Sequence, residues 1–334
     1  LRLLRAYRFA AQYNFSIDKR TAEAIKKHVK LIVLSSSERI REEISKIFQT
    51  TKSFHIIYSM DRIGLLEKIF PEIKNLKKEK TYYFHPEGLW GHCLEVLYCY
   101  EFILQNLSSL FDKEKLQLLL NYIDSSNMKI ILALSSLLHD AGKPETLKVE
   151  SGKVQFHGHE RLSSKKIKNI MKDLKFSNKT IELTKSIAYY HMSLGNMVPL
   201  KNVTDKAFYR FFKKAGEAAF GVMIITLADC LASMRGAHNI SYKDTISVQE
   251  FESENFKQYR DFVNRVFSWY LSKRKVMAKK RILSGTDIMQ KLKLKQGKLI
   301  GKILDILDEK VVEGKIKTKA QAFNFIKKWL KEQK

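Results

Sequence analysis

The sequence predicts an all-α fold, and two observations lead to this prediction. Nearly every segment repeats its apolar residues at the three- and four-residue spacing of an amphipathic helix. The chain of 334 residues also contains only four prolines and 14 glycines, and no proline follows Pro199, so long helices can continue without a break. We find no strand pair and no internal repeat in the sequence. The expected elements are therefore helices joined by loops.

The spacing of apolar residues in the N-terminal part predicts three helices, which span residues 2–13, 35–48 and 61–70. Asn14 is expected to end the first helix. Ser35 and Glu38 have the spacing of a capping box ahead of the second. Pro71 stops the third, because proline cannot continue a helix. The charged residues 74–80 predict a solvated connection, and we place a domain boundary there.

The same spacing in the middle of the chain predicts six further helices, over residues 89–107, 129–140, 160–174, 178–191, 205–215 and 217–235. Gly142 and Pro144 break the second of these, and the polar residues 145–158 predict a loop. The tail adds an apolar stripe at helical spacing, formed by Ile300, Ile303, Leu304, Leu307 and Val311. Thr318 and Gln321 have capping-box spacing ahead of a final helix.

Composition excludes several classes of protein. Hydrophobic residues make up 45% and charged residues 29%, which is typical of globular proteins and excludes a collagen, a disordered tail or a bare coiled coil. No run of 18 apolar residues occurs, so we predict no membrane span and no membrane partner. Three cysteines without a Cys-x-x-Cys pair favour a reducing, cytoplasmic location. The chain begins without methionine, and we expect it to be part of a longer protein.

Basic residues are concentrated at the two ends of the chain. The whole chain holds 61 lysines and arginines against 35 acidic residues. Residues 1–80 contain 18 basic and nine acidic residues, residues 81–272 contain 24 and 20, and residues 273–334 contain 19 and six. Such flanks are either an ordinary solvated surface or the binding surface for a polyanion. Charge alone does not distinguish RNA from DNA or from an anionic membrane.

Two aspartates lie in strongly apolar helical segments, and histidines occur near them in the sequence. Asp140 ends one such segment and Asp229 lies in another, where an unpaired carboxylate costs several kcal/mol. Arg235 is one candidate partner for Asp229. A metal ion is the other, because His92 shares the inward face of its predicted helix and His139 precedes Asp140. Imidazole and carboxylate without thiolate favour Mn²⁺, Fe²⁺, Co²⁺, Ni²⁺ or Mg²⁺ over a structural zinc ion.

The series His92, His139-Asp140 and Asp229 resembles the H…HD…D signature of the HD phosphohydrolase superfamily. Residues 138–143, Leu-His-Asp-Ala-Gly-Lys, match the HDxGK core of that signature. The resemblance implies a divalent metal ion held by these two histidines and two aspartates. The activity that it implies is metal-dependent hydrolysis of a phosphate ester.

The same resemblance implies further roles around this metal. Lys143 would be a phosphate-facing cation that acts in catalysis together with His139 and Asp140. His159 and His191 resemble the extra histidines of many superfamily members. These two residues would contact phosphate or a second metal ion.

The flanks resemble the class II tRNA nucleotidyltransferase and poly(A) polymerase family. Blocks within residues 1–72 are similar to the neck of that family, and residues 285–334 are similar to its helical body. Family members carry an EDxxR-type motif whose side chains help to select the incoming nucleotide. Arg2 aligns with the arginine of that motif, and Arg5 and Arg8 continue its helical row. The resemblance implies that these three arginines contact RNA or a nucleotide.

This resemblance covers nearly the whole chain and implies three parts: a neck over residues 1–78, an HD domain over 79–240 and a basic, tRNA-binding body over 241–334. The longer protein would add C, A or CCA, or a poly(A) tail, to RNA 3′ ends using ATP or CTP. Its nucleotidyltransferase head would precede Leu1, because this chain contains no Asp-x-Asp pair for two metal ions. The HD site would hydrolyse 2′,3′-cyclic or terminal phosphates on the 3′ ends of tRNA or other RNA.

Two other interpretations stay open. The HD fold could be a catalytically idle scaffold within an RNA-binding clamp. Alternatively, the chain could be a free-standing HD nucleotide phosphohydrolase, although a mononucleotide substrate needs no extended basic surface. A tRNA clamp loses affinity steeply as salt rises, whereas a small-substrate enzyme responds weakly. The sequence indicates neither the identity of the metal nor the oligomeric state.

Overall fold

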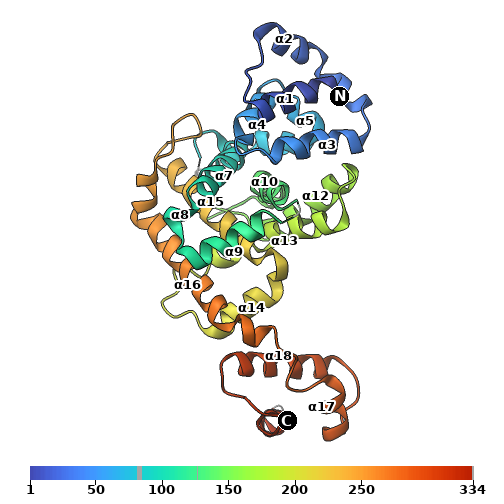
Figure 1. Cartoon of the computed structure of the whole chain (residues 1–334), viewed down its shortest axis with the longest axis vertical. Coiled ribbons are helices and arrows are strands. Elements are labelled where there is room, and N and C mark those ends of the chain that lie inside the picture. The colour runs from blue at the N-terminus through green and yellow to red at the C-terminus, as the bar shows by residue number, and fades with distance from the viewer. Residues whose placement is uncertain (81–84, 126, 333–334) are drawn as a thin grey trace. The chain divides into compact units, whose positions relative to one another are not determined.

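The computed structural model describes residues 1–80, 85–125 and 127–332, and helices form most of this part of the chain (Figure 1). The described residues also contain two short strands. The predicted all-α class is therefore confirmed. The chain divides into two compact units, Leu1–Pro199 with Glu217–Val263 and Leu200–Gly216 with Asn264–Lys334. The three-part division inferred from the sequence stays a prediction.

Seven helical elements open the first unit: α1 (Arg2–Tyr13), α2 (Lys19–His28), η1 (Val29–Leu34), α3 (Ser37–Phe48), α4 (Ser53–Arg62), α5 (Leu66–Ile69) and α6 (Ile73–Lys78). Asn14 ends α1 in the left-handed conformation, with a φ of 55°, as predicted. α1 packs on α3 and α4 through its apolar face. Asp18 caps α2, because its carboxylate accepts hydrogen bonds from the backbone N–H groups of Arg20 and Thr21.

Three predictions for this segment are wrong in detail. Ser36, not Ser35, is the N-cap of α3, and its side chain makes no capping hydrogen bond with the described residues. The helix predicted over residues 61–70 is interrupted: α4 ends at Arg62, α5 begins at Leu66, and Gly64 lies between them with a φ of 76°. Glycine adopts this conformation without the steric cost that a Cβ brings. The solvated connection predicted at residues 74–80 is mostly the helix α6.

The remainder of the first unit is a helical bundle. Its elements are α7 (Gly88–Gln105), α8 (Leu107–Leu110), α9 (Lys113–Ile123), α10 (Met128–Leu138), α11 (Lys143–Thr146), α12 (His159–Asp173), α13 (Asn178–Gly195), α15 (Ala219–Ala237) and η3 (Val248–Glu252). α7, α10, α13 and α15 pack against one another in the middle of this bundle (Figure 1). α10 and α15 bury most of their residues, which explains why they are apolar on every face.

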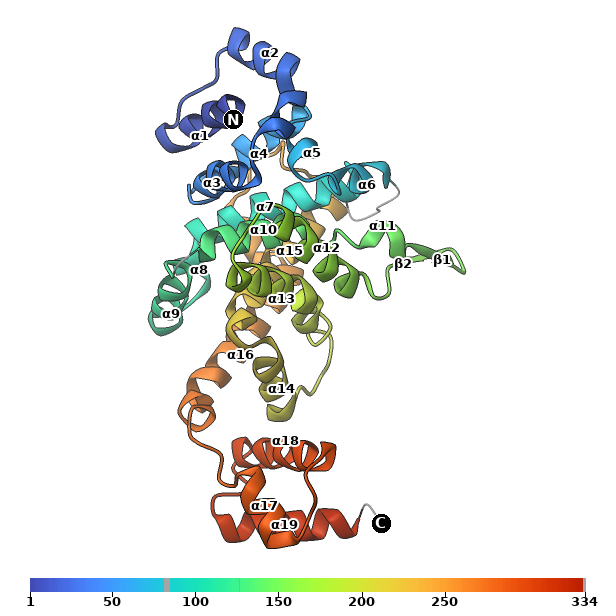
Figure 2. The same cartoon turned by 90° about the vertical axis from the view of Figure 1, so that its right-hand side faces the viewer.

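A β-hairpin replaces the loop predicted at residues 145–158. β1 (Lys148–Glu150) pairs antiparallel with β2 (Lys153–Gln155), so that Val149 lies opposite Val154. Ser151 and Gly152 connect the strands, and both have positive φ. Two successive residues of this kind are what a tight hairpin turn requires. The hairpin extends away from the helical bundle (Figure 2). Each strand has only three residues, so the alternation of apolar and polar residues is too short to be recognised in the sequence.

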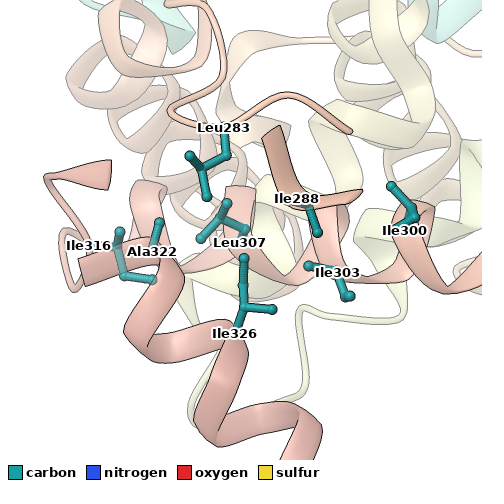
Figure 3. Packing of buried hydrophobic residues seen from close by; sticks show 8 residues of the cluster. All are labelled: Leu283, Ile288, Ile300, Ile303, Leu307, Ile316, Ala322 and Ile326. Carbon is teal, nitrogen blue, oxygen red and sulfur yellow. The ribbon is translucent and has the colours of Figure 1, made fainter. Parts of the chain in front are cut away.

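The second unit is a smaller helical body. It contains α14 (Asp205–Ala215), α17 (Gly285–Leu292), α18 (Lys298–Val312) and α19 (Lys319–Lys331), while η2 (Gly216–Ala218) and α16 (Glu254–Met277) contribute residues to both units. Its core is drawn in Figure 3 and consists of Leu283, Ile288, Ile300, Ile303, Leu307, Ile316, Ala322 and Ile326. The predicted capping box is confirmed, because the Thr318 hydroxyl and the Gln321 side chain each accept a hydrogen bond from the other residue's backbone N–H.

One stretch is long and apolar enough to be compared with a membrane span. It runs from Asp205 to Ala237, and 78% of its apolar window is buried inside the structure. Burial of this kind is characteristic of a core helix, and α15 forms part of the bundle core.

Candidate metal centre

Three helices of the bundle bring the four predicted metal ligands together. His92 lies on α7, His139 and Asp140 follow α10, and Asp229 lies on α15. His92 Nε2 is 3.1 Å from Asp229 Oδ1 and 3.6 Å from Asp140 Oδ2. His139 Nε2 is 3.2 Å from Asp140 Oδ2 and 4.0 Å from Asp229 Oδ1. The four side chains thus lie in one cluster.

The cluster is buried on one side and open on the other. The side chains of His92, His139 and Asp140 are fully buried, whereas that of Asp229 is 24% exposed. Two buried carboxylates in one cluster are costly unless a cation lies between them. The partial exposure of Asp229 leaves one edge of the cluster accessible to solvent.

The histidines are oriented as metal ligands. His139 Nδ1 lies 2.9 Å from the Ser136 carbonyl oxygen, and donation of its N–H to that oxygen leaves the Nε2 lone pair directed at the cluster. Among the described residues, neither His139 Nε2 nor the two Asp140 oxygens have a hydrogen-bond partner. The His139 Nε2 lone pair and the Asp140 carboxylate, whose Oδ2 also lies 2.5 Å from Lys143 Nζ, are donor atoms that suit a divalent cation.

His159 and His191 lie beside Asp140. Their Nε2 atoms are 3.4 Å and 3.7 Å from Asp140 Oδ1, and 3.4 Å from each other. Each Nδ1 lies close to a carbonyl oxygen one turn back, that of Phe156 at 2.7 Å and that of Ala188 at 2.6 Å. Asp140 therefore directs Oδ2 toward His92 and His139, and Oδ1 toward His159 and His191. The described residues contain three groups with metal-ligand spacing in all, and Asp140 or His139 belongs to each of them.

Lys143 is the only residue of the predicted catalytic set that carries a permanent positive charge. Its Nζ lies 2.5 Å from Asp140 Oδ2, and the side chain is almost buried beside the Phe156 ring. Lys143 follows Gly142, whose backbone N–H donates to Ser163 Oγ at 2.8 Å. The lysine is thus held close to the carboxylate by the packing of α11 against α12.

The electrostatics of the cluster favour charged carboxylates. Burial opposes a charge on His139, but the neighbouring Asp140 and Asp229 outweigh it and raise the pKa of His139, whereas the pKa values of His92 and His191 are lowered. Burial opposes ionisation of Asp140, but the positive charges of His139 and Lys143 outweigh it and hold its pKa well below the usual range. The pKa of Asp229 is also lowered, because the hydrogen bond with His92 outweighs the effect of burial. Burial lowers the pKa of His191 to about 3 and also lowers the pKa of His92. Neutral imidazole is the form that binds a metal ion.

Arg235 does not pair with Asp229, so that candidate ion pair is wrong. The Arg235 guanidinium is buried and donates from Nε to Glu95 Oε1 at 2.7 Å. It also donates to the Glu250 carboxylate at 2.7 Å and 2.9 Å, and to two backbone carbonyls of the loop before η3. Because Glu95 lies on α7 one turn beyond His92, this network fixes the helix that carries the ligand. Sequence inspection missed Glu95, although a glutamate within an apolar helix is itself a signal of a buried partner.

The three N-terminal arginines lie on α1 and have different surroundings. Arg8 Nε donates to Glu43 Oε2 at 2.6 Å, and the Arg8 side chain is only 14% exposed. Arg5 is half exposed at 3.5 Å from Glu43, and Arg2 is exposed. The row predicted from the sequence therefore forms, but Glu43 neutralises one end of it.

Comparison with known proteins gives two family matches. Residues 159–326 match the family described as "tRNA nucleotidyltransferase domain 2", which is half of the chain. Residues 14–77 match "Probable RNA and SrmB- binding site of polymerase A". The match over residues 14–77 covers α2 to α5 and nearly all of α6, and the other match runs from the start of α12 into α19.

Curated relatives match along nearly the full chain. A CC-adding tRNA nucleotidyltransferase of Thermus thermophilus is 24% identical over 336 residues, covering 98% of this chain and 66% of the relative. An A-adding tRNA nucleotidyltransferase of Deinococcus radiodurans is 24% identical over 339 residues, covering 99% of this chain and 68% of the relative. The chain thus spans about two thirds of the length of these proteins.

Solved structures show the same fold. A CCA-adding enzyme in complex with ATP superposes with a TM-score of 0.54 at 14% identity, covering 98% of this chain and 60% of that chain. The Thermotoga maritima CCA-adding enzyme complexed with tRNA gives a TM-score of 0.52 at 15% identity, covering 98% and 60%. At these identities the likeness concerns the fold alone. With half of its residues matched to one family and its whole length aligned with curated members, the chain belongs to the tRNA nucleotidyltransferase family.

Proposed function

We propose that this chain binds tRNA as part of a tRNA nucleotidyltransferase, and that its His–Asp centre is a metal-dependent phosphohydrolase site. Two kinds of observation support tRNA binding. Relatives are named for adding C or A to tRNA, and a neighbour of the same fold was solved with tRNA. The flanking parts of the chain are also strongly basic, which suits a phosphate backbone. The chain contains no Asp-x-Asp pair, so we assign no nucleotide addition with ATP or CTP to its own residues.

The phosphohydrolase proposal rests on one observation: His92, His139, Asp140 and Asp229 gather in one cluster, within which His92, His139 and Asp140 have the spacing of metal ligands. These residues would hold Mn²⁺, Fe²⁺, Co²⁺, Ni²⁺ or Mg²⁺. When bound, such an ion polarises a phosphoryl oxygen and lowers the pKa of a bound water molecule.

The residues around the ligands suit a phosphate ester. His159 and His191 face Asp140 Oδ1 and can hold phosphate oxygens or a second ion. Lys143 places a positive charge within 2.5 Å of Asp140, where it would offset the negative charge of a phosphate. Burial of the inner ligands keeps bulk water away and strengthens these interactions. The substrates that we propose are 2′,3′-cyclic or terminal phosphates at RNA 3′ ends.

Hydrolysis of 2′,3′-cyclic AMP by the purified chain with Mn²⁺ or Ni²⁺ tests this site. We expect turnover that Asp140→Ala abolishes together with bound metal, measured by elemental analysis. Asp124→Ala is the matched control, because that aspartate is 67% exposed and lies outside the cluster. Stoichiometric metal without turnover would contradict the cyclic phosphate as substrate. Absence of both metal and turnover would overturn the enzyme proposal and leave an RNA-binding scaffold.

Binding of tRNA is tested separately by its dependence on salt. We expect the affinity of the chain for tRNA to fall steeply between about 50 mM and 200 mM salt, as counterions return to the phosphates. A flat salt dependence, or no binding at all, would contradict the tRNA proposal and favour a free-standing phosphohydrolase for a small substrate.

A further inference from the structure

Three aromatic side chains form a continuous exposed surface at the end of α1. Phe9, Tyr13 and Phe15 are 43%, 60% and 66% exposed. The ring centroids of Phe9 and Tyr13 lie 6.0 Å apart with an angle of 23° between the rings. Those of Tyr13 and Phe15 lie 5.6 Å apart with an angle of 29°. We call these three nearly parallel rings the aromatic row.

The backbone holds the aromatic row in place. Phe9 and Tyr13 are one turn apart on α1, away from the buried face that carries Leu4, Tyr7 and Ala10. Asn14 then reverses the chain at a φ of 55°, and the Phe15 N–H donates to the Ala10 carbonyl at 3.1 Å. This helix end places Phe15 beside Tyr13. The row is therefore a preformed surface, and its rings contribute little to the core.

Positive charge accompanies the aromatic row. The Arg8 guanidinium lies 4.0 Å from the centroid of the Phe9 ring, and Glu43 holds it there through a 2.6 Å hydrogen bond. Residues 1–34 contain eight lysines and arginines against two acidic residues. A protein partner with an apolar face would gain nothing from this excess of charge. A strand of nucleic acid would use both features, because it carries phosphates and flat bases together.

We propose that the aromatic row stacks the unpaired bases of single-stranded RNA. Every base has a face that stacks on an aromatic ring, so such binding tolerates different sequences. Basic residues of α1 and α2 would contact the backbone of the same strand. This inference rests on the proposed RNA binding and deepens it, because it names the surface and the part of the RNA that is bound.

Two probes of equal charge test the inference. The affinities of the full chain for oligoadenylate of about ten nucleotides and for an abasic oligonucleotide of the same length are measured by fluorescence anisotropy. The test variant carries Phe9→Ala, Tyr13→Ala and Phe15→Ala. Leu34→Ala is the control, since Leu34 is 80% exposed in the same part of the chain but outside the row. Tyr13→Trp keeps an aromatic face.

We expect the triple variant to bind oligoadenylate at least about tenfold more weakly, because each stacked base contributes measurably to affinity. Its affinity for the abasic probe and the salt dependence of its binding should stay unchanged. Leu34→Ala and Tyr13→Trp should bind like the original chain. Circular dichroism verifies that the triple variant is folded, which the exposure of all three rings favours.

The outcomes separate this inference from the proposed function. Equal loss of affinity on both probes, or no loss on either, would overturn stacking by the aromatic row. If tRNA binding persists in that case, the proposed function stands, and the aromatic row would bind a different partner, such as a protein. Failure of the original chain to bind tRNA and oligoadenylate would overturn both proposals.

Discussion

Gly142 shows how the absence of a side chain positions the residues of the His–Asp cluster. A Cβ at this residue would lie 2.5 Å from the His159 carbonyl oxygen and 2.7 Å from the Ser163 backbone nitrogen. Both are backbone atoms of α12, so they cannot rotate away. Glycine thereby lets α12, which carries His159, approach the segment that contains Asp140.

Gly142→Ala is accordingly expected to destabilise the first unit by about 1–3 kcal/mol, because the helix must shift to admit the methyl group. Chemical denaturation monitored by circular dichroism measures this change. Gly195→Ala is the matched control, because its Cβ would meet only the Tyr259 ring at an ordinary 3.7 Å. Equal stability of both variants would contradict the close-approach argument.

Asp140 and Arg235 show how far individual residues could be predicted. The apolar segment before Asp140 already indicates a buried carboxylate that needs a cation. The partner of Arg235 could not be predicted, because Glu95 is 140 positions away in the sequence and reaches it only through the packing of α7 on α15.

At the scale of elements, Glu101 of α7 caps the helix α4. Its Oε1 accepts hydrogen bonds from Ser53 Oγ at 2.5 Å and from the Phe54 backbone N–H at 2.9 Å. Burial nevertheless raises the pKa of Glu101 to about 7, since these bonds only partly offset the loss of hydration. The folded protein therefore keeps a proton on Glu101 that the unfolded chain releases at a lower pH.

This difference predicts a pH dependence of stability. Between pH 4.5, the ordinary value for glutamate, and about 7, the folded state binds more protons at this site, so its contribution to the unfolding free energy falls as pH rises. The slope is at most about 1.4 kcal/mol per pH unit. Glu101→Gln should flatten the curve in this window, measured by urea denaturation at several pH values against the original chain. An unchanged slope would mean that Glu101 is ionised throughout.

Helix caps give a second prediction at this scale. Thr318→Ala should lower the stability of the second unit by about 1 kcal/mol, because it removes the hydroxyl that accepts from the Gln321 N–H. Ser36→Ala serves as a comparison, since Ser36 occupies the N-cap of α3 without a capping hydrogen bond in the described structure. Thermal unfolding measures the loss of stability in each variant. A larger loss in Ser36→Ala than in Thr318→Ala would contradict this prediction.

At the scale of the whole molecule, the excess of positive charge is concentrated in the flanks of the chain. Arg2 and Arg5 are exposed on α1, whereas Arg8 is largely buried against Glu43, which also lies 3.5 Å from Arg5. The double change Arg2→Ala and Arg5→Ala should weaken tRNA binding and reduce the salt slope by about 0.7–0.9 for each RNA phosphate that the variant no longer neutralises. Titrations at several salt concentrations measure the slope.

Lys179→Ala is the control for this experiment, since Lys179 is 75% exposed on α13 and pairs with Glu217. It should leave the slope nearly unchanged. If the double arginine variant changes the salt slope of tRNA binding no more than Lys179→Ala does, the arginines of α1 form an ordinary solvated surface.

The sequence by itself determined the helical class, the positions of about half of the helices, the capping box at Thr318 and the identity of the residues that gather in the His–Asp cluster. These features depend on residue spacing along one helix or on a short motif, so they can be recognised locally. Tertiary structure alone decided which partner each charge takes: His92 for Asp229, Glu95 and Glu250 for Arg235, Glu43 for Arg8. It also placed Phe15 beside Tyr13. The physical reason is that such contacts form between groups on different elements or across a reversal of the chain, where packing and burial select among many possible partners.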